Sequence, residues 1–444
     1  IFTSGSTGTP KGVMISHCAA LNTIEDVNER YGVTCDDVAL AVSELSFDLS
    51  VYDIFGMMSA GGAVVVPDRA ERLDPICLAE MVKEHGVTIW NSVPALFQLY
   101  LGALDGDAES SLRIALLSGD WIPLSLPPKA ADLIPRVQLH SLGGATEASI
   151  WSITYPITDV DPEWASIPYG VGMRYQDVLV LDHRMSECRD WVTGDLYIRG
   201  YGLALGYWRD PEQTSASFVN HPVTGERMYR TGDLGRRRPD GVIEFLGRSD
   251  FQLKVGGYRV EAGEVEKAVS AHPAVREAVV VAVGSGLGDK RLACAWTRAD
   301  HESDGAADEL SGFVAGKLQE YMVPSLFKEL DELPLSANGK VDRQVVASMF
   351  EDTHIPDVAY VAPSGSEEVR MVELWESVLP HTSHIGMHDD FFGLGGSSMD
   401  AIELVTRIRR AWNVPIRLGD FYEANTPSRL LEYVRRSRIG DVNE

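Results

Sequence analysis

Short apolar runs alternate with segments of helical period over residues 1–249. The runs "AVVVPD", "GVTIWNSVP" and "LRIALLSG" have the length and composition of buried strands. The segments 16–30 and 49–60 instead repeat apolar residues at helical spacing. Ser16 is a typical N-cap, and the helix behind it would bury Leu21, Ile24 and Val27 on one face. This alternation predicts an α/β region in which helices cover a sheet.

A smaller unit of mixed helices and strands is expected from about residue 250. A helix over "EAGEVEKAVSAH" precedes strands over "REAVVVAV" and "RLACAWTR", a helix near 308–319 and a strand at 325–330. Residues 351–363 are polar, contain proline and have no helical period, which is typical of a linker. The pattern therefore predicts a large subdomain over 1–249, a small one over 250–350 and a linker over 351–363.

Residues 364–438 have the pattern of a small bundle of three amphipathic helices. Ser364 and Glu367 match a capping box at the start of the first helix. The second helix is expected to follow Ser398, and the third to begin with Thr426 as its cap. The apolar positions expected to face inward are Val369, Val372, Trp375, Met399, Ile402, Val405, Ile408 and Trp412. This segment is predicted to be an all-α domain.

Charge and cysteine content exclude several classes of function. The chain carries 39 basic and 65 acidic residues, a formal net charge of -26. Such a surface repels phosphate backbones, so we expect no nucleic-acid partner. The five cysteines lie far apart without a C-x-x-C pair, which argues against zinc or a disulfide framework and favours the reducing cytoplasm.

We also expect no membrane partner, because no apolar run is long enough to cross a bilayer. The first residues, "IF", have the character of a strand end inside a domain. We therefore expect the chain to be part of a longer protein, truncated within its first subdomain.

Two glycine-rich strings carry the candidate chemistry. "IFTSGSTGTPKG" is not the phosphate loop of the common NTPases, because Lys11 precedes Gly12 and not Ser or Thr. "DDFFGLGGSSMDAIEL" places Ser398 where a glycine-rich turn meets a helix N-terminus, a position that favours a phosphodiester. Taken alone, the first string is also compatible with a flexible loop and Ser398 with an ordinary N-cap.

The rest of the chain supplies six further strings in a fixed order: "SFDLSVYDIFG", "GGATEAS", "GDLYIRGYGLALGYW", "YRTGDL", "GRSDFQLKVGGYRVEAGEVE" and "LPLSANGKVDR". With "FTSGSTGTPKG" these resemble the signature motifs of the adenylate-forming superfamily. "DDFFGLGGSSMDAIEL" resembles the attachment site of a carrier protein. Essentially the whole chain is similar to an adenylation–carrier didomain of a nonribosomal peptide synthetase. The resemblance implies a truncated large α/β subdomain, a small α+β subdomain and an all-α carrier bundle.

The resemblance also implies the reaction. An amino acid is activated with ATP as aminoacyl-AMP, pyrophosphate leaves, and the aminoacyl group passes to the thiol of a 4′-phosphopantetheine arm on Ser398. Two anions must meet in the first step, so the site must neutralise charge and position the reactants. Taken alone, the residues that follow have ordinary structural interpretations, and their roles are what the resemblance implies.

The implied nucleotide contacts are spread over several strings. Glu147 is the expected Mg²⁺ ligand and Thr146 a phosphate contact. Asp233 would accept hydrogen bonds from the ribose, and Arg248 would contact the nucleotide. The remaining phosphate-loop and nucleotide contacts are Thr3, Ser4, Gly5, Ser6, Thr7, Gly8, Lys11 and Gly144.

Catalysis is expected to involve a moving lysine. By resemblance Lys340 bridges the substrate carboxylate and the α-phosphate, then withdraws as the small subdomain rotates about Asp250. A lone lysine in "SANGK" would otherwise be a solvated surface residue.

The chain departs from the family pattern at three places. The family has Tyr-Gly-Pro-Thr-Glu where this chain reads Gly143-Gly144-Ala145-Thr146-Glu147, so the aromatic that stacks on adenine is absent. Part of the nucleotide affinity must therefore come from elsewhere. Gly256 replaces an arginine, and Ser397 replaces the usual His or Asp.

The substrate pocket of the family lies at fixed offsets from the motifs. Asp48 would pair with the α-ammonium of an amino acid, although it also fits an N-cap of the helix 49–60. Asn91 and Ser118 are the small polar members of an otherwise apolar set. The full set is Asp48, Leu49, Tyr52, Asn91, Leu116, Ser118, Leu142, Ile150, Trp151 and Lys340. This set resembles that of cysteine-activating domains, and "SLGGATEASIW" resembles the subgroup that feeds thiazoline-forming cyclisation domains.

The implied partners are L-cysteine, an upstream condensation or heterocyclisation domain and a phosphopantetheinyl transferase. The sequence leaves open the need for a small MbtH-like protein. Three alternatives also stay open: a module for serine or another small amino acid, a stand-alone acyl-CoA or aryl-acid ligase, and a degenerate adenylation scaffold with a functional carrier domain.

Overall fold

The computed structural model describes residues 1–3, 10–68, 71–104, 110–164, 166–248, 252–255, 258–284, 290–299, 306–334, 341–350, 360–379, 384–391, 394, 396 and 398–440. Contacts within the chain divide it into two compact units, Ile1–Glu264 and Val265–Glu444.

A seven-stranded sheet forms the centre of the first unit. Its strands are β3 (Val38–Leu40), β4 (Ala63–Val65), β5 (Ile89–Ser92), β6 (Ile114–Leu117), β7 (Gln138–Gly143), β8 (Ile153–Ile157) and β9 (Val171–Gly172). Their order is β4-β3-β5-β6-β7-β8-β9, parallel from β4 to β7 and antiparallel beyond. Every residue of β5 and β6 is buried, as the apolar runs predicted. The α/β expectation for this region is confirmed.

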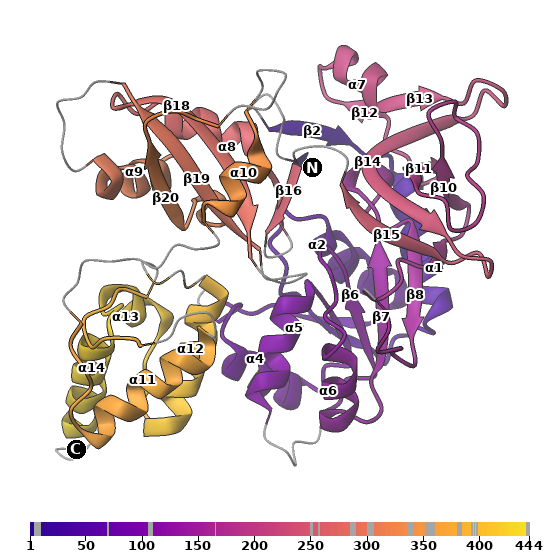
Figure 1. Ribbon diagram of the computed structural model, residues 1–444. Coiled ribbons are helices and arrows are strands. Elements are labelled where there is room, and N and C mark those ends of the chain that lie inside the picture. The colour runs from indigo at the N-terminus through magenta and orange to yellow at the C-terminus, as the bar shows by residue number, and fades with distance from the viewer. Residues whose placement is uncertain are drawn as a thin grey trace. The chain divides into compact units, whose positions relative to one another are not determined.

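Helices cover this sheet. They are α1 (His17–Arg30), α2 (Leu49–Val51), α3 (Met57–Ala60), α4 (Pro75–His85), α5 (Pro94–Ala103) and α6 (Leu126–Leu133), and α4, α5 and α6 lie side by side (Figure 1). Ser16 caps α1, accepting a 3.1 Å hydrogen bond from the Ala19 amide. Ile24 and Val27 are buried, but Leu21 is 46% exposed, so its predicted inward position is wrong. The helix expected over 49–60 contains a π-helical turn, η1 (Tyr52–Gly56).

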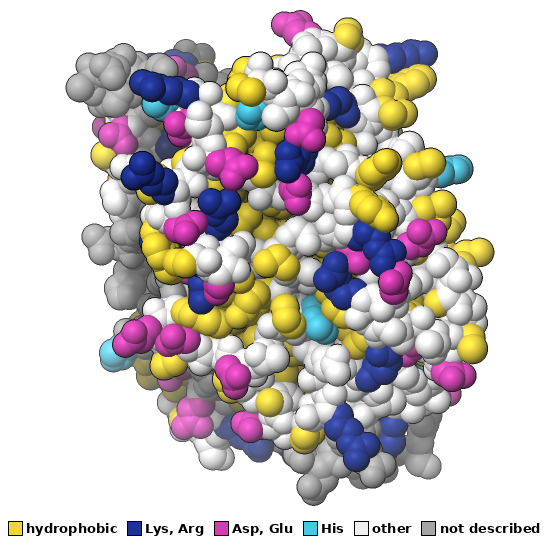
Figure 2. Space-filling model, turned by 90° about the vertical axis from the view of Figure 1, so that its right-hand side faces the viewer, with side chains coloured by type: hydrophobic (Ala, Val, Ile, Leu, Met, Phe, Trp, Pro, Cys, Tyr) yellow, Lys and Arg dark blue, Asp and Glu magenta, His cyan; other side chains and the backbone are white. Residues whose placement is uncertain are grey.

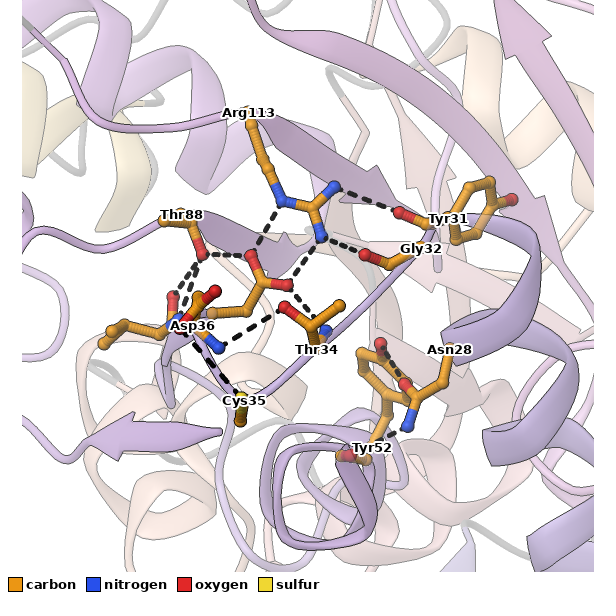
Figure 3. A network of polar contacts seen from close by, with 12 residues as sticks. Asn28, Tyr31, Gly32, Thr34, Cys35, Asp36, Tyr52, Thr88 and Arg113 are labelled. Atoms are coloured by element: carbon orange, nitrogen blue, oxygen red, sulfur yellow. Dashed lines mark hydrogen bonds and ion pairs between the residues drawn. The ribbon is translucent and has the colours of Figure 1, made fainter. Parts of the chain in front are cut away.

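A polar network ties the end of α1 to the sheet (Figure 3). The Arg113 guanidinium donates to both carboxylate oxygens of Asp37 at 2.7 Å and to the carbonyl oxygens of Tyr31 and Gly32 at 3.0 Å. The Thr88 hydroxyl donates to Asp37 at 2.7 Å. Burial would raise the pKa of Asp37, but these donors outweigh it and lower that pKa below its ordinary value. The network fixes the α1–β3 corner beside Tyr52.

A second sheet completes the first unit. It contains β10 (Gln176–Leu181), β11 (Gly194–Gly200), β13 (Phe218–Asn220), β14 (Arg227–Arg237) and β15 (Ile243–Arg248), all antiparallel. A small sheet joins β1 (Phe2–Thr3), β2 (Lys11–Met14) and β12 (Gly206–Tyr207), and α7 (Pro211–Ser217) follows it. The hairpin β16 (Gln252–Val255) and β17 (Tyr258–Glu261) ends the unit. On the face drawn in Figure 2, charges of both signs are interspersed with hydrophobic side chains.

The second unit begins with a three-stranded sheet. Strand β18 (Val275–Val283) pairs antiparallel with β19 (Arg291–Arg298), which pairs parallel with β20 (Leu326–Leu330). The associated helical segments are α8 (Ala262–Ser270), α9 (Ala306–Ala315), η3 (Glu320–Met322) and α10 (Arg343–Ser348). Val279, Val281, Val346 and Phe350 belong to one buried cluster. The expected α+β composition is confirmed, and residues 351–359 of the expected linker lie outside the described residues.

The C-terminal part of this unit is a helical bundle of α11 (Ser366–Val378), α12 (Ser398–Trp412), α13 (Leu418–Glu423) and α14 (Pro427–Gly440). The sequence pattern did not predict α13. Thr426 accepts a hydrogen bond from the Arg429 amide as the cap of α14, as predicted. Trp375 packs edge-on against Phe391, which packs against Phe421.

Two details of the bundle correct the sequence prediction. Gly365 is the N-cap of α11, and the amide and hydroxyl of Ser364 both donate to Glu368, so the capping box with Glu367 is wrong. Val369 is 41% exposed and not inward, whereas the side chain of Met399 lies outside the described residues. The other predicted inward positions are buried. In the described part of the chain, no helix is long and apolar enough to span a membrane.

Candidate active site

A cavity in the first unit gathers many of the residues that the sequence singled out. It is lined by segments that follow β6 and β7 and by residues of β14 and β15. The predicted residues that line it are Asp48, Leu49, Ser118, Leu142, Gly144, Thr146, Ile150, Trp151, Asp233 and Arg248. The residues expected to bind the amino acid and those expected to bind the nucleotide therefore line the same cavity.

Asp48 and Thr146 connect the residues expected to bind the amino acid with those expected to bind the nucleotide. The Thr146 hydroxyl donates a 2.6 Å hydrogen bond to the Asp48 carboxylate. Asp48 has helical backbone angles and makes no capping hydrogen bond to α2, so the N-cap interpretation is wrong. Only 9% of Asp48 is exposed, and it lines the cavity. A nearly buried carboxylate at this place suits a cationic group of a ligand.

Asp233 and Arg248 form an ion pair at another part of the cavity wall. They face each other across β14 and β15, and the Arg248 guanidinium donates to Asp233 at 2.7 Å and to the Thr231 carbonyl at 3.1 Å. Both side chains are largely buried. The pairing holds the carboxylate in place, and a carboxylate with several acceptor sites can take further donors, as the ribose role requires.

Glu147 is buried next to the cavity, in η2 (Thr146–Ala148). The Tyr207 hydroxyl donates to its carboxylate at 2.7 Å, and the Lys11 ammonium lies 5.7 Å from the centre of the Tyr207 ring. Tyr207 therefore links the expected metal ligand to the expected phosphate-loop lysine. Among the described residues no group of three metal-binding side chains occurs. A single carboxylate fits Mg²⁺, which is commonly held by one or two carboxylates together with substrate phosphates.

The apolar wall of the cavity is formed by Leu49, Leu142, Ile150 and Trp151. Ile150 has φ +72°, a left-handed conformation that a β-branched residue rarely adopts. The neighbouring residue Ser149 holds the backbone in this conformation through two hydrogen bonds. Its hydroxyl donates to the Gly202 carbonyl at 2.7 Å, and its own carbonyl accepts from the Thr23 hydroxyl at 3.0 Å. Backbone strain of this kind is typical of functional sites.

Ser118 is the polar exception on this wall. Its hydroxyl is buried and has no hydrogen-bond partner among the described residues. The buried Thr3 hydroxyl, at the end of β1, likewise has none there. A buried unpaired hydroxyl costs free energy unless a ligand satisfies it.

Three of the predicted substrate-binding residues, Tyr52, Asn91 and Leu116, do not line the cavity. The Tyr52 hydroxyl donates to Asn28 at 2.9 Å (Figure 3), and its ring packs against Trp151 with centroids 5.3 Å apart. The Asn91 amide donates to Asp53 at 2.8 Å and to the Leu49 carbonyl at 3.2 Å. Burial raises the pKa of Asp53 to about 8, although the Asn91 hydrogen bond opposes the shift. These residues support the cavity wall from behind.

Several predicted residues lie outside the described part of the chain, namely Ser4, Gly5, Ser6, Thr7, Gly8, Asp250, Gly256, Lys340 and Ser397. Ser398 is itself the first residue of α12, which was predicted to follow it, and its side chain is not described.

Sequence reasoning missed the aromatic part of the cavity, formed by Trp121, Tyr169, Tyr229 and Phe245. It also missed Tyr207 as the partner of Glu147. The available sequence signal was the glycine at 143, which lacks the aromatic ring that the family pattern has at this position.

Comparison with known proteins agrees with this geometry. Residues 1–208 match a model of the AMP-binding enzyme family, and residues 264–340 match the AMP-binding enzyme C-terminal domain. Residues 369–434 match the phosphopantetheine attachment site.

Named relatives and a solved structure resemble the same regions. The anguibactin system regulator of Vibrio anguillarum is 43% identical over 100% of this chain and 43% of its own length. Pyochelin synthetase PchF of Pseudomonas aeruginosa is 53% identical over 64% of this chain and 16% of its own length. Holo-PA1221, a nonribosomal peptide synthetase protein with adenylation and PCP domains bound to a vinylsulfonamide inhibitor, superposes with a TM-score of 0.78. It is 28% identical, over 98% of this chain and 72% of its own. The chain spans less than half the length of these two curated relatives.

Proposed function

Because the chain joins an AMP-binding adenylation enzyme to a phosphopantetheine attachment domain of the nonribosomal peptide synthetase type, we propose that it activates L-cysteine with ATP and loads it onto its own carrier domain. The first step forms cysteinyl-AMP and releases pyrophosphate. The second passes the cysteinyl group to the arm on Ser398 and releases AMP. The hydrogen bond between Thr146 and Asp48 carries the proposal, because it joins the two halves of the site.

Selection of an α-amino acid rests on Asp48. Its carboxylate lines the cavity, is nearly buried and is oriented by Thr146. An α-ammonium group placed there would form a charge-assisted hydrogen bond that an aryl or fatty acid cannot offer. This argues against the stand-alone aryl-acid or acyl-CoA ligase.

Cysteine as the side chain is supported by the composition of the cavity wall. Leu49, Leu142, Ile150 and Trp151 present apolar surface, and the unpaired Ser118 hydroxyl is the small polar group among them. The Asn91 amide donates to Asp53 and Leu49, so its donors are already engaged. A thiol is short, apolar in bulk and weakly hydrogen-bonding, and matches this wall.

Serine is the main alternative substrate, because its hydroxyl could also bond to Ser118. The apolar wall disfavours it, since burying a hydroxyl with a single partner is costly compared with burying a thiol.

Charge neutralisation would be shared among several residues. Glu147, held by Tyr207, would ligate Mg²⁺ together with the ATP phosphates, and the ion would supply positive charge at those phosphates. Lys11 and the loop Ser4–Gly8, with Thr3, would bind the phosphates, while Asp233 and Arg248 would bind the ribose side. Lys340 would complete the site and withdraw when the small subdomain turns about Asp250.

The carrier bundle would supply the group that accepts the cysteinyl residue. Ser398 stands at the N-terminus of the 15-residue helix α12, whose end favours the phosphodiester of an attached arm. The arm, once attached by a phosphopantetheinyl transferase, provides the thiol that accepts the aminoacyl group. An upstream condensation or heterocyclisation domain would use the loaded carrier, and an MbtH-like protein is a further proposed partner.

Substrate-dependent exchange of labelled pyrophosphate into ATP, measured with the full-length protein across the amino acids, tests the proposal. We expect the strongest signal with L-cysteine. Lys340→Ala should reduce it by about 100-fold or more, because a positioned charge on the reacting groups is lost. Lys129→Ala, at an exposed position of α6, is the matched control and should leave the exchange unchanged. A preference for serine, threonine or an apolar amino acid would reject cysteine, and no exchange with any amino acid would favour the degenerate scaffold.

A further inference from the structure

The Tyr169 ring occupies the space beside Gly143 that a side chain at position 143 would need. A Cβ atom built on Gly143 would lie 1.8 Å from Cε2 and 2.4 Å from Cζ of Tyr169. Non-bonded carbon atoms lie about 3.5–4.0 Å apart at their optimal separation, and a Cβ atom essentially never comes within 3.0 Å of another heavy atom. A side chain at 143 and the Tyr169 ring therefore exclude each other.

The backbone around Tyr169 holds the ring at this place. The amides of Tyr169 and Gly170 donate to the Ile243 carbonyl at 2.9 and 3.1 Å, and the Ile243 amide returns a bond to Gly170 at 2.8 Å. Gly170 has φ +121°, and a Cβ atom on it would lie 2.0 Å from the Thr154 carbonyl oxygen. Only glycine fits between Tyr169 and β9, so the main chain that carries the ring is fixed at this place.

Tyr169 belongs to an aromatic wall on the nucleotide side of the cavity. Its ring centroid lies 5.6 Å from that of Phe245, which lies 4.8 Å from that of Trp121. All three residues line the cavity together with Asp233 and Arg248. Burial and the nearby Asp233 charge raise the pKa of Tyr169, although the backbone amide of Gly144 and the charge of Arg248 oppose the shift. The phenol is therefore neutral at physiological pH, and the residue lines the cavity.

We propose that Tyr169 binds the purine base of ATP, replacing from the segment before β9 the aromatic that Gly143 does not provide. This inference rests on the proposed nucleotide-dependent function. Aromatic rings stack on any base, and each such contact contributes substantially to affinity. Tyr169 is favoured over Phe245 and Trp121 because its ring fills the space beside Gly143, the position at which the family pattern has its aromatic side chain.

Direct binding of two probes tests this role without requiring catalysis. AMP carries the base, whereas inorganic triphosphate does not. We expect Tyr169→Leu to weaken AMP binding, measured by calorimetry, by about tenfold or more, and to leave triphosphate binding unchanged. Tyr169→Phe should bind AMP like the unchanged protein. Tyr175→Leu, at a ring that is 69% exposed and outside this cavity, is the matched control and should have no effect.

A second variant covers the case in which Tyr169→Leu fails to fold. Gly143→Tyr alone should lose AMP binding by collision with Tyr169, and the double variant Gly143→Tyr/Tyr169→Gly should recover it. Unchanged AMP affinity in a folded Tyr169→Leu protein would overturn the proposal. Equal loss of both probes, or a base-specific loss only in Phe245→Leu or Trp121→Leu, would overturn it as well. Because AMP binding requires no amino acid, a wrong substrate assignment would leave the test intact.

Discussion

Thr146 donates its hydroxyl hydrogen bond to Asp48, at 2.6 Å, across 98 positions of sequence. The expected phosphate contact is thus also the residue that orients the expected ammonium ligand. The expected nucleotide-binding and amino-acid-binding parts of the cavity therefore meet at this bond.

Replacing Asp48 by asparagine should damage amino-acid recognition. The substitution keeps the size of the side chain but removes the charge opposite an α-ammonium, a loss of about 3 kcal/mol for a buried charge pair. We expect kcat/KM for the amino acid to fall about 100-fold in pyrophosphate exchange, with the KM for ATP little changed. Asp36→Asn, on the exposed surface, is the matched control. An equal fall in kcat/KM for ATP would contradict the assignment of Asp48 to amino-acid binding.

Replacing Tyr207 by phenylalanine should affect the metal requirement. The variant keeps the ring beneath Lys11 but removes the hydroxyl that orients the Glu147 carboxylate. Loss of an outer partner of a metal ligand typically weakens metal affinity by about 10-fold to 100-fold. We expect the Mg²⁺ concentration for half-maximal exchange to rise by at least about tenfold, with activity recovering at saturating Mg²⁺. A reduced rate at every Mg²⁺ concentration would indicate a purely structural role.

Acid should destabilise the first unit through His140. Its ring packs on Tyr31 with centroids 4.2 Å apart, and neither ring nitrogen has a hydrogen-bond partner among the described residues. Burial, assisted by Arg30, lowers the pKa of His140 from 6.5 to about 4. Above pH 6.5 the imidazole is neutral in the folded and unfolded states alike. Between pH 6.5 and 4 the unfolded chain binds a proton that the folded chain does not, so stability falls as pH falls.

The size of this effect follows from the pKa difference. At pH 5 the loss amounts to about 2 kcal/mol, since one pKa unit corresponds to about 1.4 kcal/mol. His140→Phe keeps an aromatic ring against Tyr31 but cannot titrate. We expect its free energy of unfolding in urea to drop less between pH 7 and pH 5 than that of the unchanged protein. Identical pH dependence of the two proteins would contradict the prediction.

Ser398→Ala should separate activation from loading. The variant removes the hydroxyl proposed to carry the phosphopantetheine, whereas the cavity in the first unit is untouched. We expect mass spectrometry to show no added arm after treatment with a phosphopantetheinyl transferase, and pyrophosphate exchange to be unchanged. Ser397→Ala, at the neighbouring serine of the same motif, should still be modified. Attachment of the arm to the Ser398→Ala protein would place the site elsewhere.

Much of the fold could be predicted from local pattern. The buried runs of β5 and β6 and the Ser16 cap of α1 follow from spacing and residue type. The errors arose where contacts with the rest of the fold determine whether a side chain is exposed or where a helix begins. Leu21 has helical spacing but lies on an exposed part of α1, and Glu368 takes the place of Glu367 because α11 begins one residue later than predicted.

The motifs identified Asp48, Thr146, Glu147, Asp233 and Arg248 as candidates, but not their partners. Thr146 with Asp48 and Glu147 with Tyr207 are hydrogen-bonded pairs from distant segments. Sequence spacing carries no information on such pairs. Asn91, counted as a pocket residue, donates to Asp53 behind the wall, because a fully buried carboxyl needs a donor.

The sequence by itself determined the order of the modules and the candidate residues of the site, with Ser398 as the expected acceptor, because residue types at fixed spacing carry that information. Only the tertiary structure decided which aromatic ring stands beside Gly143. Whether two side chains can share a volume depends on how distant strands bring them together, and here that volume is filled by Tyr169.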